Sequence, residues 1–325
     1  MLRVDKNKKQ GILFIIGAGF CFALMTFFVR KSGNLPTIQK AFFRNVVAVV
    51  VAFVLLARSK QGFRIHKGSI PGLLARSFFG TCGILCNFFA ADHLDIADAS
   101  MLNKLSPFFA IAVSYIILKE RANAVEWISV VIALIGAAFV VKPTGGVTTL
   151  YGLVGLAGGL AAGLGYTFIR YLGKRGERGP VIVLWFSMFS CLVTAPSLIF
   201  DYHPMSAEQL TFLLLTGLSA SGGQLCITKA YTKAAARDIS VFDYSQIFFA
   251  AILGWIFLEQ MPDIYSWIGY FIIIGTAVAK WFYMMRRDRA AADADSVAAE
   301  ATGAEADSAA TADGATESTA AETNE

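Results

Sequence analysis

The chain is dominated by apolar runs of about twenty residues, separated by short segments that carry charges or turn residues. An α-helix needs about 20 such residues to cross a hydrocarbon layer about 30 Å thick, and about ten runs reach that length. We predict membrane-spanning helices at residues 11–29, 37–57, 70–90, 97–118, 125–141, 150–169, 181–200, 210–231, 239–258 and 265–284.

The runs are rich in Phe, Leu, Val and Ala and do not alternate apolar with polar residues. Backbone groups in lipid must be satisfied within the protein, so this pattern favours helices over a β-barrel. The composition agrees, because only 16% of the residues are charged, against about 25% in a soluble domain. The predicted fold class is all-α integral membrane. We expect the first run to be retained, since no small-residue cleavage site stands out and many runs follow.

Positive charges concentrate before the first run and after the second, fourth, sixth, eighth and tenth runs. Lys and Arg in short loops favour the cytoplasmic side, so both termini are predicted to be cytoplasmic. The remaining loops hold mainly acidic residues: Asp92, Asp95, Asp201, Glu208, Glu259 and Asp263. Residues 290–325 consist mainly of Ala, Thr, Ser, Asp and Glu, which predicts a disordered, solvated acidic tail.

The chain also matches itself at a constant shift of 140 residues. The matched pairs include Gly83 and Gly223, Cys86 and Cys226, Asp98 and Asp238, Phe108 and Phe248, and Trp127 and Trp267. One shift that holds over several runs indicates a duplication: a basic N-terminus at 1–10 is followed by a first repeat at 11–145 and a second at 150–286. Each repeat holds an odd number of spans, so the second enters the membrane from the opposite side. Such inverted repeats are common in alternating-access transporters.

Three local patterns carry a family resemblance. Residues 102–120 read LNKLSPFFAIAVSYIILKE, residues 141–143 read Val-Lys-Pro, and Arg44 follows Phe42 and Phe43. These patterns resemble the EamA-like ten-helix proteins of the drug/metabolite transporter superfamily over both repeats. The second repeat departs from the pattern, because Ile247 replaces the proline and Glu259 falls one position before the equivalent of Glu120.

The resemblance implies a secondary transporter that moves a small polar metabolite by alternating access in a bacterial cytoplasmic membrane. Export of amino acids or related metabolites is the first expectation. Import or exchange of organic anions or nucleoside-like metabolites, and multidrug efflux, are alternatives, and a polytopic membrane enzyme is a distant one. The expected partners are the substrate, the lipid bilayer and, if transport is ion-coupled, a proton. We expect no nucleic acid partner, and either a monomer or a homodimer fits the residues.

Polar and small residues form one stripe on the fourth run and another on the ninth. At helical spacing these are Asn103, Ser106, Pro107, Ala110 and Ser114, and Asp243, Gln246, Ala250 and Gly254. Such stripes either line a central cavity or let helices pack closely. We favour the cavity, with Asn103, Ser106, Asp243 and Gln246 binding the substrate, because a carboxylate is a costly way to hold helices together. Asp243 is the predicted proton carrier if transport is coupled to a proton.

Lys104 has three interpretations: it pairs with Asp243, contacts an anionic group of the substrate, or snorkels to the interface. Counting 1.5 Å per residue from opposite faces leaves at least about 10 Å of depth between Lys104 and Asp243. We therefore expect separate roles rather than a direct salt bridge. Arg44, about 10 Å deep by the same count, is too costly to face lipid and is a substrate-binding candidate. Lys40 and Arg76 lie nearer the ends of their runs and are expected to snorkel.

Other in-membrane polar residues are weaker candidates. Asn87 and Gln224 either contact the substrate or make structural hydrogen bonds. Tyr166 follows a run of glycines whose commoner use is close packing, and it is a candidate lining aromatic. Packing or gating roles are assigned to Pro107, Gly83 and Gly223.

The chain lacks the signatures of other function classes. The three histidines, His66, His93 and His203, are widely separated in or near loops, and the cysteines fall inside apolar runs without a metal-ligand set. There is no Gly-rich phosphate-binding loop. We therefore expect no enzyme activity, no cofactor, no metal and no ATP-driven pumping.

Overall fold

The computed structural model describes residues 6–59, 65–66, 68–117, 119, 123–142, 146–233 and 240–287. Its elements are α1 (Lys6–Lys31), α2 (Thr37–Arg58), α3 (Ile70–His93), α4 (Ile96–Asn103), α5 (Ser106–Ile117), α6 (Ala124–Val141), α7 (Val147–Lys174), α8 (Gly179–Phe200), α9 (Ala207–Lys233), η1 (Ser240–Tyr244), α11 (Ser245–Leu258) and a last helix, Ile264–Arg287. The chain forms two compact units, Met1–Lys280 and Trp281–Glu325. The predicted tail at 290–325 and the loop residues Glu120 and Asp238 lie outside the described residues.

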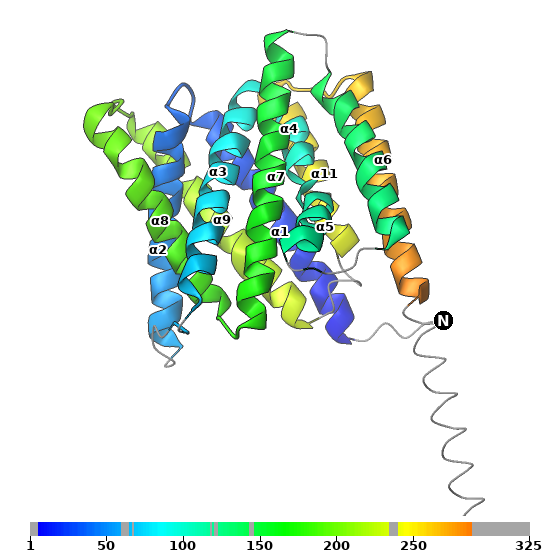
Figure 1. Ribbon diagram of the computed structural model, residues 1–325. Helices are drawn as coiled ribbons and strands as arrows, with labels where there is room; N and C mark the ends of the chain where they lie inside the picture. Colours follow the sequence, from blue (N-terminus) through cyan, green and yellow to red (C-terminus); the bar gives the residue numbers. More distant parts are fainter. Residues whose placement is uncertain are drawn as a thin grey trace, which may run out of the picture. The chain divides into compact units, whose positions relative to one another are not determined.

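Within the described residues, ten helical segments are long and apolar enough to cross a membrane. They agree with the ten predicted runs to within a few residues: Thr37–Arg58 and Ala124–Val141, for example, correspond to the runs at 37–57 and 125–141. The prediction of an all-α membrane protein is confirmed. Figure 1 shows α1 starting at the lower end of the bundle. We call this end the N-terminal face and the other end the opposite face.

The fourth and ninth spans are broken, although the sequence pattern predicted continuous helices. In the first repeat α4 ends at Asn103 and α5 begins at Ser106. In the second, the 3₁₀ turn η1 ends at Tyr244, where α11 takes over. At the shift of 140 both breaks fall at the same position. Pro107 explains the first break, because it has no N–H to donate to the carbonyl four residues earlier.

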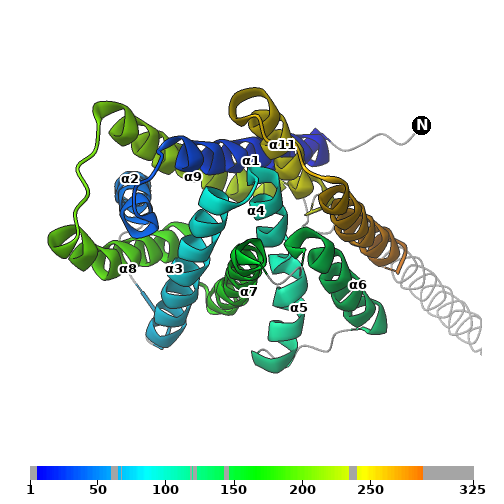
Figure 2. The ribbon, with the colours of Figure 1, turned by 90° about the horizontal axis from the view of Figure 1, so that it is seen from above.

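The two repeats interlock. Helix α1 of the first repeat packs against α9 and α11 of the second, and α7 of the second packs against α3, α4 and α5 of the first. The equivalent helices α2 and α8 pack against each other. Figure 2, looking down the bundle, shows α1 beside α9 and α11, and α7 among α3, α4 and α5. Neither repeat can therefore bury its apolar faces without the other.

Glycines permit the closest of these crossings. A Cβ atom added to Gly19 of α1 would lie 2.9 Å from the Gln246 nitrogen, and one added to Gly163 of α7 would lie 2.8 Å from the Ser106 carbonyl oxygen. A Cβ on Gly83 would lie 3.2 Å from the Ala162 nitrogen, and one on Gly223 would lie 2.8 Å from the Phe22 ring. The contacts of Gly19 and Gly163 put the backbones of α1 and α7 directly against the two broken spans.

We predict that Gly163→Val destabilises the fold by about 1–3 kcal/mol, because the new side chain meets a backbone carbonyl that cannot move without shifting α5. Thermal unfolding of the detergent-solubilised protein measures the effect. Gly173→Val in the same helix is the matched control, since a Cβ at Gly173 meets nothing within 4 Å. Equal melting temperatures for the two variants would contradict this account of the crossing.

Candidate functional site

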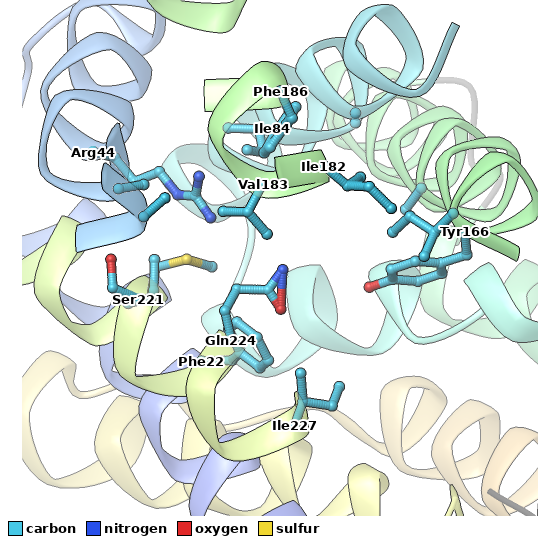
Figure 3. Close-up of a pocket in the computed structure, with 18 of the residues that line it drawn as sticks. Phe22, Arg44, Ile84, Tyr166, Ile182, Val183, Phe186, Ser221, Gln224 and Ile227 are labelled. Atoms are coloured by element: carbon cyan, nitrogen blue, oxygen red, sulfur yellow. The ribbon is translucent and has the colours of Figure 1, made fainter. Parts of the chain in front are cut away.

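A cavity of about 410 Å³ lies at the centre of the helical bundle. Its walls come from both repeats, chiefly from α1, α2, α3, α7, α8 and α9, and residues at the two helix breaks complete it. Figure 3 shows the side chains of Arg44, Tyr166 and Gln224 directed into it from different walls. The volume lies in the range that small-molecule sites occupy, about 300–1,000 Å³.

The cavity extends toward the N-terminal face. Helix α8 begins on that face, and its lining residues fall between Gly179 and Phe186, in its first turns. Helix α9 ends on that face, and its lining residues fall between Ala220 and Ile227, in its second half. Lining residues on α2 continue to Leu55, close to its end on the same face. The site is therefore placed between the middle of the bundle and the N-terminal face.

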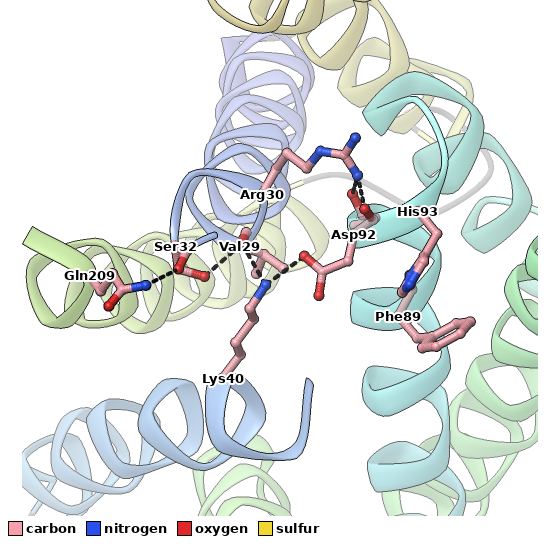
Figure 4. Close-up of polar contacts among 9 residues, drawn as sticks. Val29, Arg30, Ser32, Lys40, Phe89, Asp92, His93 and Gln209 are labelled. Atoms are coloured by element: carbon pink, nitrogen blue, oxygen red, sulfur yellow. Dashed lines mark hydrogen bonds and ion pairs between the residues drawn. The ribbon is translucent and has the colours of Figure 1, made fainter. Parts of the chain in front are cut away.

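Polar contacts join helices at the opposite face, as Figure 4 shows. The Lys40 ammonium lies 2.6 Å from an Asp92 carboxylate oxygen and donates to the Val29 carbonyl at 3.2 Å. Arg30 donates to the backbone carbonyls of Ala91 and Asp92. These contacts tie the ends of α1, α2 and α3 together. The expectation that Lys40 snorkels is wrong, because its side chain is fully buried against a carboxylate that a depth count could not locate.

A second cluster on the opposite face surrounds Asp98 of α4. Its carboxylate accepts hydrogen bonds from Tyr270 at 2.6 Å and Ser266 at 3.0 Å, and Lys142 lies 3.6 Å away. Lys142 also pairs with Asp263 at 2.9 Å. Burial opposes ionisation of Asp263, but hydrogen bonds from the Ser266 backbone N–H and from Lys142 lower the pKa of this carboxyl below its ordinary value. The cluster joins α4, the end of α6 and the last span.

An ion pair connects the two helix breaks at the cavity. The Lys104 ammonium lies 2.5 Å from an Asp243 carboxylate oxygen, and the Tyr244 hydroxyl donates to the Lys104 carbonyl at 3.4 Å. The expectation of separate roles for Lys104 and Asp243 is wrong. The depth estimate assumed straight helices. It included neither the helix breaks nor the length of the lysine side chain. At the shift of 140, Asn103 corresponds to Asp243 and Lys104 to Tyr244, so the pair lies where the repeats meet.

The structure brings most of the predicted site residues together. Those that line the cavity are Asn103, Lys104, Gln246, Asn87, Gln224, Tyr166, Arg44 and Gly83. Asp243 reaches it through Lys104, and the Asn87 amide also donates to the Ala99 carbonyl at 3.5 Å. Ser106 is buried against α7, Pro107 is exposed, and Gly223 faces the Phe22 ring. These last three are outside the cavity lining.

Arg76 lines the cavity but was not predicted as a site residue, because the sequence analysis expected it to snorkel. Its side chain is instead buried and lines the cavity, with its guanidinium 4.4 Å from the centre of the Phe186 ring. Snorkelling was the wrong interpretation because the helix face of Arg76 points at protein. A signal was present, since Gly80, Gly83 and Asn87 follow Arg76 at helical spacing and also line the cavity.

Comparisons with known proteins agree with this architecture. The model of the EamA-like transporter family matches residues 9–142 and 149–279. The Pseudopaline exporter CntI of Pseudomonas aeruginosa (strain UCBPP-PA14) is 32% identical over 275 residues, covering 83% of this chain and 95% of the relative. The Riboflavin transporter of Brucella anthropi is 28% identical over 264 residues, covering 78% of this chain and 90% of the relative. Human Solute carrier family 35 member G1 is 24% identical, covering 84% and 80%.

A solved structure described as "Crystal structure of protein" covers 86% of this chain and 98% of its own, with a TM-score of 0.60 and 14% identity. At this identity the likeness concerns the fold alone. The family model covers both repeats, and the relatives named above are transporters or exporters over nearly the same length. The chain belongs to the EamA-like transporter family and is a multi-pass membrane transporter.

Proposed function

We infer that this protein exports a small polar metabolite by alternating access. The observation that carries the proposal is the asymmetry of the bundle: the central cavity extends to the N-terminal face, while Lys40, Asp92 and Arg30 join helices at the opposite face. Alternating access requires one face to be closed while the other admits the substrate. The names of the pseudopaline and riboflavin relatives support a small polar substrate and, for the first, export.

The direction of transport depends on which face is cytoplasmic. Lys9, Arg58, Lys174 and Arg175 lie at the N-terminal face, whereas acidic loop residues dominate the opposite face. Because cytoplasmic loops are enriched in Lys and Arg, we assign the N-terminal face to the cytoplasm. The structure then corresponds to an inward-facing state that receives substrate from inside the cell.

Conversion to an outward-facing state requires the contacts at the opposite face to open. The Lys40 to Asp92 ion pair joins α2 of the bundle to α3, and Gln209 of α9 donates to the Ser32 carbonyl at 3.1 Å. These contacts close the opposite face, and together with Arg30 they form the outer gate of the proposed cycle. Amino acids and related metabolites are the first substrate class to test, because the lining combines amides with basic groups.

Labelling of a single cysteine tests the gate. Met25 lines the cavity, so Met25→Cys in a background without the native cysteines reports access to it. An impermeant maleimide should react from the N-terminal face in the otherwise unchanged protein. Lys40→Met should increase reaction from the opposite face on the order of tenfold, because it leaves the partly buried Asp92 carboxylate without its paired cation and so disfavours the closed state.

Lys31→Met is the matched control, since Lys31 is an exposed lysine on the same face. If Lys31→Met and Lys40→Met label equally from the opposite face, Lys40 is not part of a gate. Reaction from the opposite face in the unchanged protein, with none from the N-terminal face, would overturn the proposed inward-facing state.

Efflux from proteoliposomes tests both the substrate class and the central ion pair. Labelled glutamate should leave faster than from protein-free liposomes, with labelled glutamine as the zwitterionic comparison, and Lys104→Met or Asp243→Asn should slow the efflux of glutamate at least about tenfold. Each single change should also cost about 3–5 kcal/mol of stability, because one buried charge loses its partner. The double variant Lys104→Met/Asp243→Asn should regain melting temperature while efflux stays slow. Recovery of efflux in the double variant would show that the pair is only structural, and absence of efflux from the unchanged protein would exclude these amino acids.

Proton coupling gives a separate prediction for Asp243. Protonation of its carboxylate would neutralise the partner of Lys104 and break the ion pair, so a proton carrier at this position makes efflux depend on pH. Asp243→Asn mimics the protonated form in shape and should make the residual efflux independent of pH. The measurement is the initial rate of efflux as the pH of the medium is varied. Rates that do not change with pH in either protein would remove the proton from the mechanism.

A further inference from the structure

Two buried guanidinium groups lie in the cavity wall, and the part of the chain that the structure describes gives neither of them an acidic partner. Arg44 of α2 and Arg76 of α3 are each 6% exposed, and both line the cavity. They share the ring of Phe186, whose centre is 5.9 Å from the Arg44 guanidinium carbon and 4.4 Å from that of Arg76. The Nε atom of each arginine is buried and has no hydrogen-bond partner. Among the described residues, no carboxylate oxygen lies within 4.0 Å of either guanidinium.

Two buried lysines, unlike these arginines, each have a carboxylate partner within the protein. Lys104 is neutralised by Asp243, and Lys40 is neutralised by Asp92. Among the described residues, the Arg44 guanidinium donates a hydrogen bond to the neutral Asn45 side chain, at 2.7 Å. Among the described residues, the charged side chains that line the cavity are Arg44, Arg76 and Lys104, and of these Lys104 is paired with Asp243, which leaves the two arginines as positive charges.

Retaining two unpaired charges is costly for folding. A buried charge without a counter-charge is strongly destabilising, and two like charges in one cavity repel each other. The contacts with the Phe186 ring offset part of this cost but neutralise nothing. Packing alone would be served better by apolar residues of similar volume. The pair therefore fits a role in binding, in which the counter-charge comes from the solute.

The guanidinium groups of Arg44 and Arg76 indicate which chemical group of a solute they would bind. A guanidinium group presents its N–H donors in a planar fork that matches a carboxylate in two parallel hydrogen bonds. Amide and hydroxyl groups from Asn87 of α3, Gln224 of α9 and Tyr166 of α7 can orient the polar groups in the rest of the solute. Figure 3 shows the Arg44 guanidinium and the Gln224 amide pointing into the same space. Ile182 and Val183 supply an apolar side to the cavity, as the same view shows.

We propose that the transported solute is a net-anionic organic acid, and that Arg44 and Arg76 bind its carboxylate groups beside Phe186. This proposal rests on the transport function proposed above and narrows its substrate to anions. It separates a zwitterion such as glutamine, which brings one negative and one positive charge, from a dicarboxylate, which matches both unpaired arginines.

Ligand-induced thermal stabilisation of the full-length protein in detergent tests the proposal without requiring transport, because a ligand that binds only the folded state raises its melting temperature. The probes share a chain of five carbons and differ in charge: glutarate, glutamate, glutamine and cadaverine, each at matched ionic strength. Glutarate should stabilise most, glutamate less, glutamine little and cadaverine not at all. A response to none of the four, or a response to glutamine or cadaverine equal to that of glutarate, would overturn the proposal.

Variants assign the binding to the two arginines. Arg44→Met and Arg76→Met should each weaken glutarate binding at least about tenfold, and Arg44→Lys should retain part of it because a point charge remains. Arg58→Met is the control, since Arg58 is an exposed arginine at the end of the same helix. Without ligand the two methionine variants should melt no lower than the unchanged protein, because each removes an unpaired buried charge. Glutarate binding that survives in both methionine variants would overturn the site.

The remaining arms separate the ligand class and the two proposals. Inorganic phosphate at the same ionic strength should raise the melting temperature less than glutarate does. A larger rise with phosphate would show that the site binds a phosphate group rather than carboxylates. If glutarate binds through both arginines but no bound anion leaves proteoliposomes, the site stands and the transport proposal fails. If glutamine is transported and the arginine variants transport it equally well, the transporter stands and the anion site fails.

Discussion

The ion pair between Lys104 and Asp243 joins the two repeats at the point where both broken spans meet. Placing either charge alone inside an apolar bundle costs several kcal/mol, so each residue requires the other in the folded protein. A direct contact of 2.5 Å is possible only because α4 stops at Asn103 and η1 gives way to α11 at Tyr244. The helix breaks, the glycine crossings that place α1 and α7 against the broken spans, and the inner end of the cavity all lie around this contact.

The two repeats share their helical architecture but differ in the residues at the helix breaks. The equivalent positions 103 and 243 hold Asn and Asp, and the positions 104 and 244 hold Lys and Tyr. A symmetric pair of lysines or aspartates would repel at this point, whereas the diverged copies attract. The same divergence places Phe22 opposite Gly223 and the smaller Ala162 opposite Gly83, so the two halves of the cavity wall differ.

The buried cations of this protein have two kinds of surroundings. At the opposite face Lys40 has the protein's own carboxylate, Asp92, as its partner, which suits a contact that closes the bundle in the absence of solute. In the cavity, Arg44 and Arg76 have aromatic and amide neighbours but no such carboxylate among the described residues. A group that must bind and release a solute cannot be satisfied permanently by the protein. This difference is the physical basis on which we propose a gate at the opposite face and solute binding in the cavity.

The sequence by itself determined the membrane spans, the duplication and, on the fourth and ninth spans, the helix face that carries polar residues. These are local or periodic properties: a run of about 20 apolar residues specifies a membrane helix without reference to any partner. It also identified Asn103, Gln246, Asn87, Gln224, Tyr166 and Arg44, which line the cavity, because a polar residue deep in an apolar run is unusual wherever the helix packs. Only the tertiary structure decided which charges meet. Lys104 contacts Asp243, Lys40 contacts Asp92, and Arg76 turns into the cavity, since the partner of a charge is set by helix breaks and crossings between distant segments, and a depth count along one helix contains neither.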